Sequence, residues 1–438
     1  MKSRNTPPDL TLPVDASRRR LVAAAGAAAL LPLQAQAAPV GTELRIGYIS
    51  PRTGALAGFG ECDPFVLDLV RKKTGGRIEV AGKSYALNIL ERDTQSDPTR
   101  ASQLAKQLIN DEKVDLMLTT STPETVNPVA DACEAGATPC LSTNDPWQSW
   151  YFGRGAKPGQ PSPFKWSYHF CFGTEQFAAM YISTWKLLPT NKRVGVLFPN
   201  DADGNALRAH LIPELRKAGF TIVDPGAYQD GTSDFSAQIS HFKAQRIEIL
   251  TGVPMSSDFI TFLRQAAQQG LTRQLKICMP AKFGLFPSDI AALGPLGFHV
   301  ATGAYWTPVF PYVSPVTGLN SRQLTDQYEA ATGQQWTQQL GASMSLIDAG
   351  FAVLKTSGKP KDKQAVVQAM SRLDVVTTVG RVNFPGGPVP HVATAPIIGC
   401  QWVKSKPGSR YALDLLVVEH ACDPKVPVQT RLLPYARA

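Results

Sequence analysis

The sequence predicts an α/β protein with two lobes, each built on a parallel sheet. Short apolar segments alternate with amphipathic segments of helical length, which is the pattern of strand–helix–strand units. The clearest example is 193–271, where three apolar segments are each followed by a predicted helix. The length of 438 residues exceeds that of one ordinary domain, which predicts a second lobe. Ligands of parallel sheets bind beyond the carboxyl ends of the strands, so we look for the site there.

Residues 1–37 are predicted to be an export signal. Twin arginines in 17–21 precede an Ala-rich, weakly apolar run at 23–33, and Ala35-Gln36-Ala37 supplies a small-x-small cleavage site. Twin arginines before a modest apolar run favour the Tat route. The apolar run is shorter than the roughly 20 residues that a transmembrane helix needs. We therefore expect a mature chain that begins near Ala38 and resides in the bacterial periplasm.

Charge and cysteine usage exclude several classes of function. Residues 1–37 hold five basic and two acidic residues, which leaves +6 of the formal net charge of +9 for the mature chain. This excess is spread along the sequence without a Lys/Arg run, so no nucleic-acid partner is expected. The seven cysteines lack metal-ligand spacing, and neither a metal nor a cofactor is expected. Export permits disulfides, and Cys133 with Cys140 and Cys400 with Cys422 are near enough in sequence to pair.

The first part of the mature chain is predicted to form alternating strands and helices. They are a strand at 44–49, a helix at 63–72, a hairpin of 78–81 with 85–91, a helix at 99–110, a strand at 114–118 and a strand end at 140–144. The loops after these strands carry candidate ligand residues, namely Arg52, Phe59, Ser121, Thr122, Ser142 and Thr143. The Gly-rich loop at 50–60 lacks the phosphate-binding motifs, but a helix N-terminus with hydroxyls nearby suits a carboxylate.

An aromatic stretch at 146–172 interrupts this alternation. It holds three Trp, two Tyr and four Phe among Gly and Pro. One interpretation is a loop between the lobes whose rings pack the surface, and we favour it for most of these rings. The other is an aromatic wall for an apolar ligand, for which Trp147, Trp150 and Tyr151 are the candidates.

The second part continues the alternation and ends in a hairpin. We predict strands at 194–198, 220–223, 247–250 and 275–279, helices around 207–218, at 235–244, 257–269, 319–332, 341–357 and 363–373, and a hairpin of 397–403 with 413–418. The strand-end loops and the second crossing between the lobes add the candidate ligand residues Asp203, Met255, Lys282 and Tyr305.

These segments resemble the type I periplasmic substrate-binding proteins of ABC importers, in the leucine/isoleucine/valine- and amide-binding class. The resemblance covers nearly all of 43–403 and rests on the opening strand and Gly-rich loop (45–60), on Asn-Asp-x-x-Gly (200–204) with 231–236, and on 379–384. It implies two Rossmann-like lobes with parallel central sheets, joined by three crossovers, that close on a ligand by hinge motion. It also implies lobe boundaries, with 43–165 and 308–378 in lobe one and 170–302 and 380–438 in lobe two.

The resemblance also implies ligand contacts, with two departures. In amino-acid-binding members the loop after the Ser/Thr strand end holds the α-carboxylate, and Ser121, Ser142 and Thr143 sit there. A tyrosine usually precedes the glycine of the Asn-Asp motif, and here it is Asp203. The ammonium-binding acid is usually found near residue 256, where this chain has Met255-Ser256. Asp203 therefore either replaces that acid or caps its helix.

Two cations add to the ligand hypothesis. Arg52 and Lys282 lie in strand-end loops, where they either pair with a ligand anion or are solvated surface charges. Together with the aromatic stretch they suggest a small carboxylate, amino acid or amide-like ligand with an apolar or aromatic body.

The sequence favours a binding protein over an enzyme. It contains none of the GxSxG, HExxH and Walker motifs, and its six histidines are dispersed, so no catalytic residue is named. We predict a monomeric solute-binding component that captures its ligand by lobe closure and delivers it to an ABC permease with its ATPase. The alternatives are a periplasmic ligand-sensing subunit of a receptor and a hydrolase.

Overall fold

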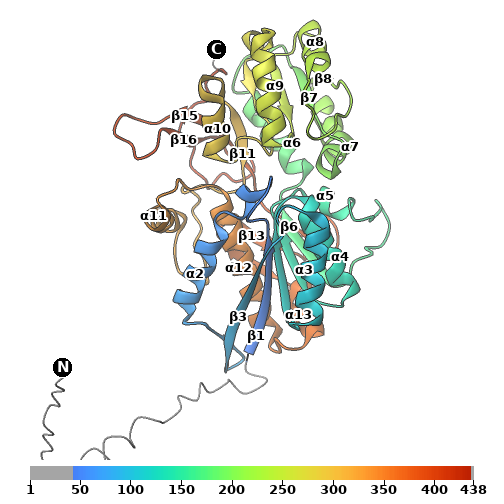
Figure 1. Cartoon of the computed structure of the whole chain (residues 1–438), viewed down its shortest axis with the longest axis vertical. Coiled ribbons are helices and arrows are strands. Elements are labelled where there is room, and N and C mark those ends of the chain that lie inside the picture. Colours follow the sequence, from blue (N-terminus) through green and yellow to red (C-terminus); the bar gives the residue numbers. More distant parts are fainter. Residues whose placement is uncertain (1–42, 436–438) are drawn as a thin grey trace, which may run out of the picture. The chain divides into compact units, whose positions relative to one another are not determined.

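The first lobe is built on a seven-stranded sheet (Figure 1). The computed structural model describes residues 43–435, so the predicted export signal lies outside the described residues. The strand order is β14-β6-β5-β4-β1-β3-β2, and β2 alone runs antiparallel to its neighbour. The strands are β1 (Glu43–Ser50), β2 (Arg77–Val80), β3 (Lys83–Asp93), β4 (Leu116–Thr120), β5 (Cys140–Thr143), β6 (Ser167–Cys171) and β14 (Val392–Thr394).

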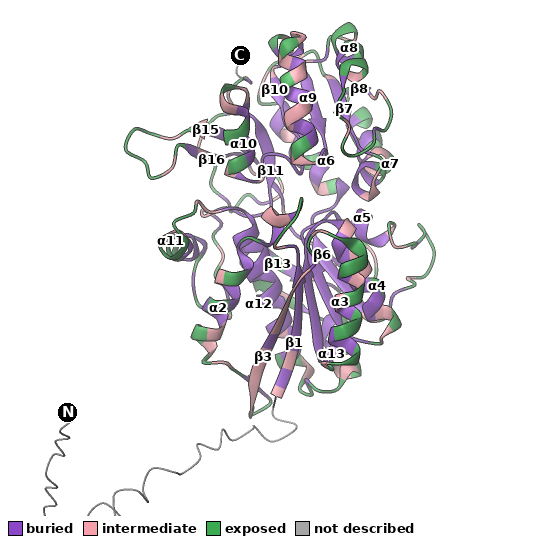
Figure 2. Ribbon diagram, in the orientation of Figure 1, coloured by how far each residue is buried: buried purple, intermediate pink, exposed green. Residues whose placement is uncertain are grey.

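Helices cover both faces of this sheet. Alternate residues of β1 point to opposite faces, so Tyr48 joins the core with α2 (Asp63–Thr74) and α12 (Gln339–Ser357), and Ile49 joins the core with α3 (Pro98–Asn110) and α4 (Pro123–Ala135). Figure 2 shows this burial along the strands, with exposed residues on the outer sides of the helices. The remaining elements are the turn η1 (Ala57–Gly60) and the helices α5 (Trp147–Tyr151), α11 (Ser321–Thr332) and α13 (Lys363–Ser371).

The second lobe contains a parallel sheet of four strands in the order β10-β9-β7-β8. Its strands are β7 (Arg193–Leu197), β8 (Thr221–Val223), β9 (Ile249–Gly252) and β10 (Ile277–Cys278), and its helices are α6 (Thr174–Trp185), α7 (Ala202–Lys217), α8 (Ser236–Ala244), α9 (Ser256–Gln268) and α10 (Pro287–Leu293). The short turns η2 (Leu271–Gln274) and η3 (Gly294–Gly297) follow α9 and α10.

Two smaller antiparallel sheets complete the fold. β11 (Ala301–Ala304), β15 (Ile398–Lys404) and β16 (Leu413–Glu419) form a three-stranded sheet, with β15 in the middle. β12 (Asp374–Thr377) and β13 (Gly380–Asn383) form a hairpin. The chain passes between the lobes three times, as predicted, after β6, after β11 and after β14; the third crossover was expected near 379 and lies after β14 instead.

The crossover after β11 is fixed by close packing. Tyr305 donates its backbone N–H to Gln338 Oε1 at 2.6 Å, and the indole of Trp306 donates to Ser321 Oγ at 3.1 Å. The Trp306 ring lies against Gly341 of α12, where an added Cβ would sit 2.1 Å from a ring atom. A side chain at position 341 would therefore force the crossover away from the helix.

The structure confirms the predicted fold class and most of the predicted elements. The structure differs from the prediction at three places: α5 and β6 form within the aromatic stretch, β10 is shorter than predicted, and β14 joins the seven-stranded sheet although 380–438 was assigned to lobe two. All seven cysteines are unbonded, so neither suggested disulfide forms. No helix within residues 43–435 is long and apolar enough to cross a membrane.

Candidate functional site

A pocket lies where the carboxyl ends of strands from both lobes approach one another. It encloses about 500 Å³ of empty space, counting the part open to solvent. Asn144, Asp145 and Pro146 follow β5 directly, whereas Val253 follows β9 and Lys282 follows β10. The rest of the lining includes Thr122, Asp203, Gln338, Phe59, Phe172, Phe177 and Leu285. This is the position that parallel sheets offer to ligands.

Lys282 lies at the centre of the charged side of the pocket. Its Nζ is 2.9 Å from Asp203 Oδ2, 3.3 Å from Asp201 Oδ2 and 3.3 Å from Glu124 Oε1. Only 8% of the residue is exposed. Glu124 belongs to α4 of the first lobe and the two aspartates to the start of α7 in the second, so this ammonium group joins the lobes.

Three carboxylates share this one ammonium group, and the excess of negative charge is reflected in the pKa values of Lys282 and Asp203. Burial disfavours the charged lysine, but Asp203, Glu124 and Asp201 outweigh it and hold the pKa of Lys282 well above its usual range. Burial raises the pKa of Asp203 to about 6, although Lys282 opposes that rise. Lys282 is therefore held in its charged form, and its positive charge is already matched by protein carboxylates.

The N-terminus of α7 separates the roles of its two aspartates. Asp201 is the N-cap, because its Oδ1 accepts the backbone N–H of Gly204 at 2.6 Å. Asp203 lies two residues further on, in the first turn, is 1% exposed, and pairs with Lys282 inside the pocket. Of the two predicted roles for Asp203, the helix cap is wrong.

Asp145 lies in the loop that directly follows β5. His169 lies beside it, with Nε2 2.9 Å from the backbone oxygen of Asp145 and 3.7 Å from its Oδ1. Burial lowers the pKa of His169 to about 3, so the imidazole is neutral. Its Nε2–H donates to that backbone oxygen, and its Nδ1 accepts from Ser142 Oγ at 2.9 Å. The histidine thus fixes the backbone of Asp145 without compensating its side-chain charge.

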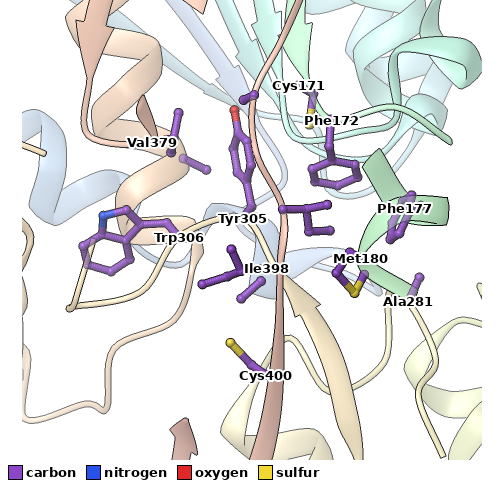
Figure 3. Close-up of a cluster of buried hydrophobic side chains, with 14 of the residues drawn as sticks. Cys171, Phe172, Phe177, Met180, Ala281, Tyr305, Trp306, Val379, Ile398 and Cys400 are labelled. Carbon is purple, nitrogen blue, oxygen red and sulfur yellow. The ribbon is translucent and has the colours of Figure 1, made fainter. Parts of the chain in front are cut away.

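Phenylalanine rings form the apolar side of the pocket. Figure 3 shows Phe172, just after β6, beside Phe177 of α6, and their ring centroids are 4.8 Å apart in an edge-to-face arrangement. The Tyr305 ring packs against Phe172, with 5.5 Å between the two ring centroids. From the first lobe, Phe59 lines the pocket and packs against Phe286, with 5.4 Å between the two ring centroids. An apolar ligand body would therefore contact ring faces and edges.

The structure brings several of the predicted ligand residues together. Phe59, Thr122, Asp203 and Lys282 line the pocket. Met255 lines a neighbouring hollow that also includes Phe59 and Lys282. Their role in ligand binding stays a prediction.

Six other predicted residues do not line the pocket. Arg52 pairs with Glu91, Trp147 donates its indole N–H to Glu175 Oε1 at 2.7 Å, and Ser142 contacts His169. The hydroxyl of Thr143 lies 2.7 Å from that of Tyr305, and Ser121 is fully buried. The suggested aromatic wall also differs, because Trp147, Trp150 and Tyr151 pack against one another and their neighbours instead. Arg52 and Lys282 both form ion pairs with protein carboxylates.

Sequence reasoning missed the residues that complete the charged side. Asn144-Asp145-Pro146 follows β5 at the carboxyl edge of the sheet, and that position was a usable signal. Glu124 was harder to identify, because an acidic residue in the first turn of a helix has a local explanation in the helix dipole. Gln338, before α12, carried no signal at all.

The arrangement suits binding. Within residues 43–435, no group of three histidine, cysteine or acidic side chains is arranged to hold a metal ion. The pocket contains carboxylates, one lysine, amides and rings, and its lining includes no serine, cysteine or histidine next to a base.

Comparison with known proteins gives a consistent result. The model of the family described as "Periplasmic binding protein" matches residues 43–405. Among curated proteins, the chain is similar to the Leu/Ile/Val-binding protein homolog 7 of Brucella abortus (strain 2308), with 23% identity over 391 residues that cover 85% of this chain and 92% of that protein.

Solved structures share the fold at low sequence identity. A solute-binding protein of an ABC transporter from Rhodopseudomonas palustris BisB5, in complex with 3,4-dihydroxybenzoic acid, superposes with a TM-score of 0.69 at 19% identity, covering 87% of this chain and 99% of that chain. The branched-chain amino acid transporter substrate-binding protein LivJ from Streptococcus pneumoniae, in complex with isoleucine, gives a TM-score of 0.65 at 15% identity, covering 86% and 99%.

Proposed function

The chain belongs to the periplasmic binding protein family, and from this membership we propose that it is the solute-binding component of an ABC importer. In this role it captures a small molecule between its lobes and presents the closed form to a membrane permease, while a separate ATPase subunit supplies the energy. The protein performs no chemistry on its ligand. Family membership places it in the periplasm or outside the cell.

The observation that carries this proposal is a pocket with walls from both lobes. Thr122 and Asn144 come from the first lobe, and Asp203, Val253 and Lys282 come from the second. The contact between Lys282 and Glu124 spans the lobes at the same place. A ligand held there would touch both lobes at once, so its binding would favour the closed arrangement over an open one.

The finer features of the proposal come from the sequence. We propose that 1–37 directs export through the Tat route, that the mature protein is a monomer, and that the lobes comprise 43–165 with 308–378 and 170–302 with 380–438, apart from β6 and β14, which belong to the sheet of the first lobe. Relatives of similar fold are described in complex with 3,4-dihydroxybenzoic acid and with isoleucine, which supports a small ligand with an apolar body.

Ligand binding by the purified mature chain tests the function. Thermal shifts with small amines, amides, carboxylates and amino acids would identify a stabilising class, and calorimetry would then give a one-to-one stoichiometry. Small-angle scattering should show a more compact protein when that ligand is present. Chemical turnover of the ligand, or no stabilisation by any class, would contradict the proposal.

A further inference from the structure

The pocket and its surroundings carry a charge opposite to that of the molecule. The mature chain retains +6 of the formal net charge, which is +9 before the +3 of residues 1–37 is removed. The pocket and the adjoining hollow nevertheless contain Lys282 as their only lysine or arginine within residues 43–435. The carboxylates that line them or pair with Lys282 are Glu61, Glu124, Asp145, Asp201, Asp203 and Asp289. A cleft of one charge sign concentrates ligands of the opposite sign.

Lys282 leaves no positive charge for a ligand. Its ammonium group already has three carboxylate partners within 3.3 Å. A ligand carboxylate that reached Lys282 would have to displace one of them and leave it buried without a partner. The sum of the charges at this point therefore opposes an anionic ligand and favours a cationic one.

Asp145 supplies the second observation. Asp145 lines the pocket and is 1% exposed, yet neither of its carboxylate oxygens receives a hydrogen bond from any residue in the described part of the chain. Oδ1 of Asp203 is likewise buried without a donor among residues 43–435. Buried acceptors are normally paired, so two such carboxylates at one pocket indicate a place for a ligand with hydrogen-bond donors.

No protein group around Asp145 donates a hydrogen bond to its carboxylate in the described part of the chain. The titratable and charged groups that face it are His169, Cys171, Arg154, Glu124, Asp203 and Lys282. His169 is neutral, and the guanidinium of Arg154 donates to Asp131 at 2.7 Å and to Ser167 Oγ at 3.0 Å and lies over the Trp150 and Phe164 rings, but it donates no hydrogen bond to Asp145. Burial, followed by the charges of Asp203 and Glu124, raises the pKa of Asp145 well above its usual range. A cation in the pocket would reverse that shift.

We propose that the pocket takes an organic cation, a compound with a protonated amine held by Asp145 and Asp203 and a compact apolar body packed on Phe172 and Phe177. This inference rests on the proposed solute-binding function and names the class of its ligand. The rings suit such a compound, because an aromatic face attracts both an apolar body and a positive charge. The absence of a metal-binding group of acids in residues 43–435 favours an organic cation over a metal ion.

Three probes of nearly equal shape separate charge from size. Benzylamine is cationic, benzamide is neutral and benzoate is anionic at pH 7.5, and all three present the same ring. L-Phenylalanine adds a ligand that carries both charges. Calorimetry on the mature chain should show binding of benzylamine, weaker binding of benzamide and L-phenylalanine, and none of benzoate.

The Asp145→Asn variant tests the site itself. Removing one charged partner of a buried ammonium should weaken the affinity for benzylamine about 10- to 100-fold. Asp348→Asn is the matched control, because Asp348 is also a buried carboxyl but lies on α12 outside the pocket, and its affinity for benzylamine should be unchanged. A thermal melt of each unliganded variant checks that it is folded.

The outcomes separate the two proposals. Binding of benzoate in preference to benzylamine, or equal benzylamine affinity of the parent and Asp145→Asn, overturns the cation proposal and leaves the solute-binding function standing. If no probe of any class binds, the solute-binding function loses its support and the cation proposal falls with it.

Discussion

Replacing Lys282 with methionine would test whether the buried ion cluster stabilises the closed protein. The substitution keeps most of the volume of the side chain but removes the ammonium group from three carboxylates at 2.9 to 3.3 Å. Breaking a buried pair by removing one partner costs about 3–5 kcal/mol. We expect the low end, about 3 kcal/mol, because Asp203 can take up a proton once the lysine is absent.

The expected change in melting temperature follows from the size of the chain. An unfolding entropy of about 2.1 cal/mol/K per residue gives ~0.8 kcal/mol/K for roughly 400 residues, so 3 kcal/mol corresponds to a decrease in Tm of about 4 °C. Differential scanning calorimetry at pH 7.5 measures it. Lys72→Met is the matched control: Lys72 pairs with Asp68 at 2.6 Å, but its side chain is 73% exposed, and an exposed pair contributes at most about 1 kcal/mol.

The pH dependence of this loss provides a second readout. Burial places the pKa of Asp203 at about 6, above its unfolded value, so at pH 5 most of the parent protein holds Asp203 protonated. The pair with Lys282 is then weaker, and the difference in Tm between the parent and Lys282→Met should be smaller at pH 5 than at pH 7.5. A loss below 1 kcal/mol at pH 7.5, or a loss that grows toward pH 5, would refute the reasoning.

Three further predictions concern other groups. Asp145 must lose its proton to hold an ammonium ion, so the affinity for benzylamine should rise from pH 5 to pH 8 in calorimetry; an affinity that falls with pH would contradict this assignment. Burial raises the pKa of Asp348 from 3.8 to about 7, against hydrogen bonds from Ser314 and two backbone amides, so the folded state binds the extra proton and its stabilising contribution is lost as pH rises through that window. The Tm of Asp348→Asn relative to the parent should therefore increase between pH 4 and pH 7, and a constant difference would be evidence against a buried titrating carboxyl. Cys422 is half-buried, whereas the other six cysteines are buried. Dithionitrobenzoate should therefore modify a single thiol in the native protein and none in Cys422→Ser.

The alternating units were predictable from the sequence because their signals are local. The segment 193–271 shows apolar strands, amphipathic helices and a glycine stop, and the structure places β7 to α9 there. The loops at the carboxyl ends of β7 and β10 then indicated Asp203 and Lys282 as site residues. Sequence order and sheet geometry were sufficient for this step.

The partners of these residues could not be predicted, because they depend on pairing between distant segments. Nothing near Lys282 in the sequence indicates that Glu124, which is 158 positions away, supplies one of its carboxylates. The same is true of Arg52 and Glu91, whose pairing removes the arginine from the site. The aromatic stretch failed for a related reason, since rings signal burial but do not indicate the surface that they bury against.

The strand β14 sets a condition on how the protein is made. This edge strand of the seven-stranded sheet comes from Val392–Thr394, although its partner β6 was synthesised more than two hundred residues earlier. A ribosome must therefore have delivered nearly the whole chain before the first lobe can be completed, and the hairpin that completes the second lobe comes later still. Neither lobe is a contiguous piece of sequence that can mature first, so a truncation before 392 should leave both unfinished.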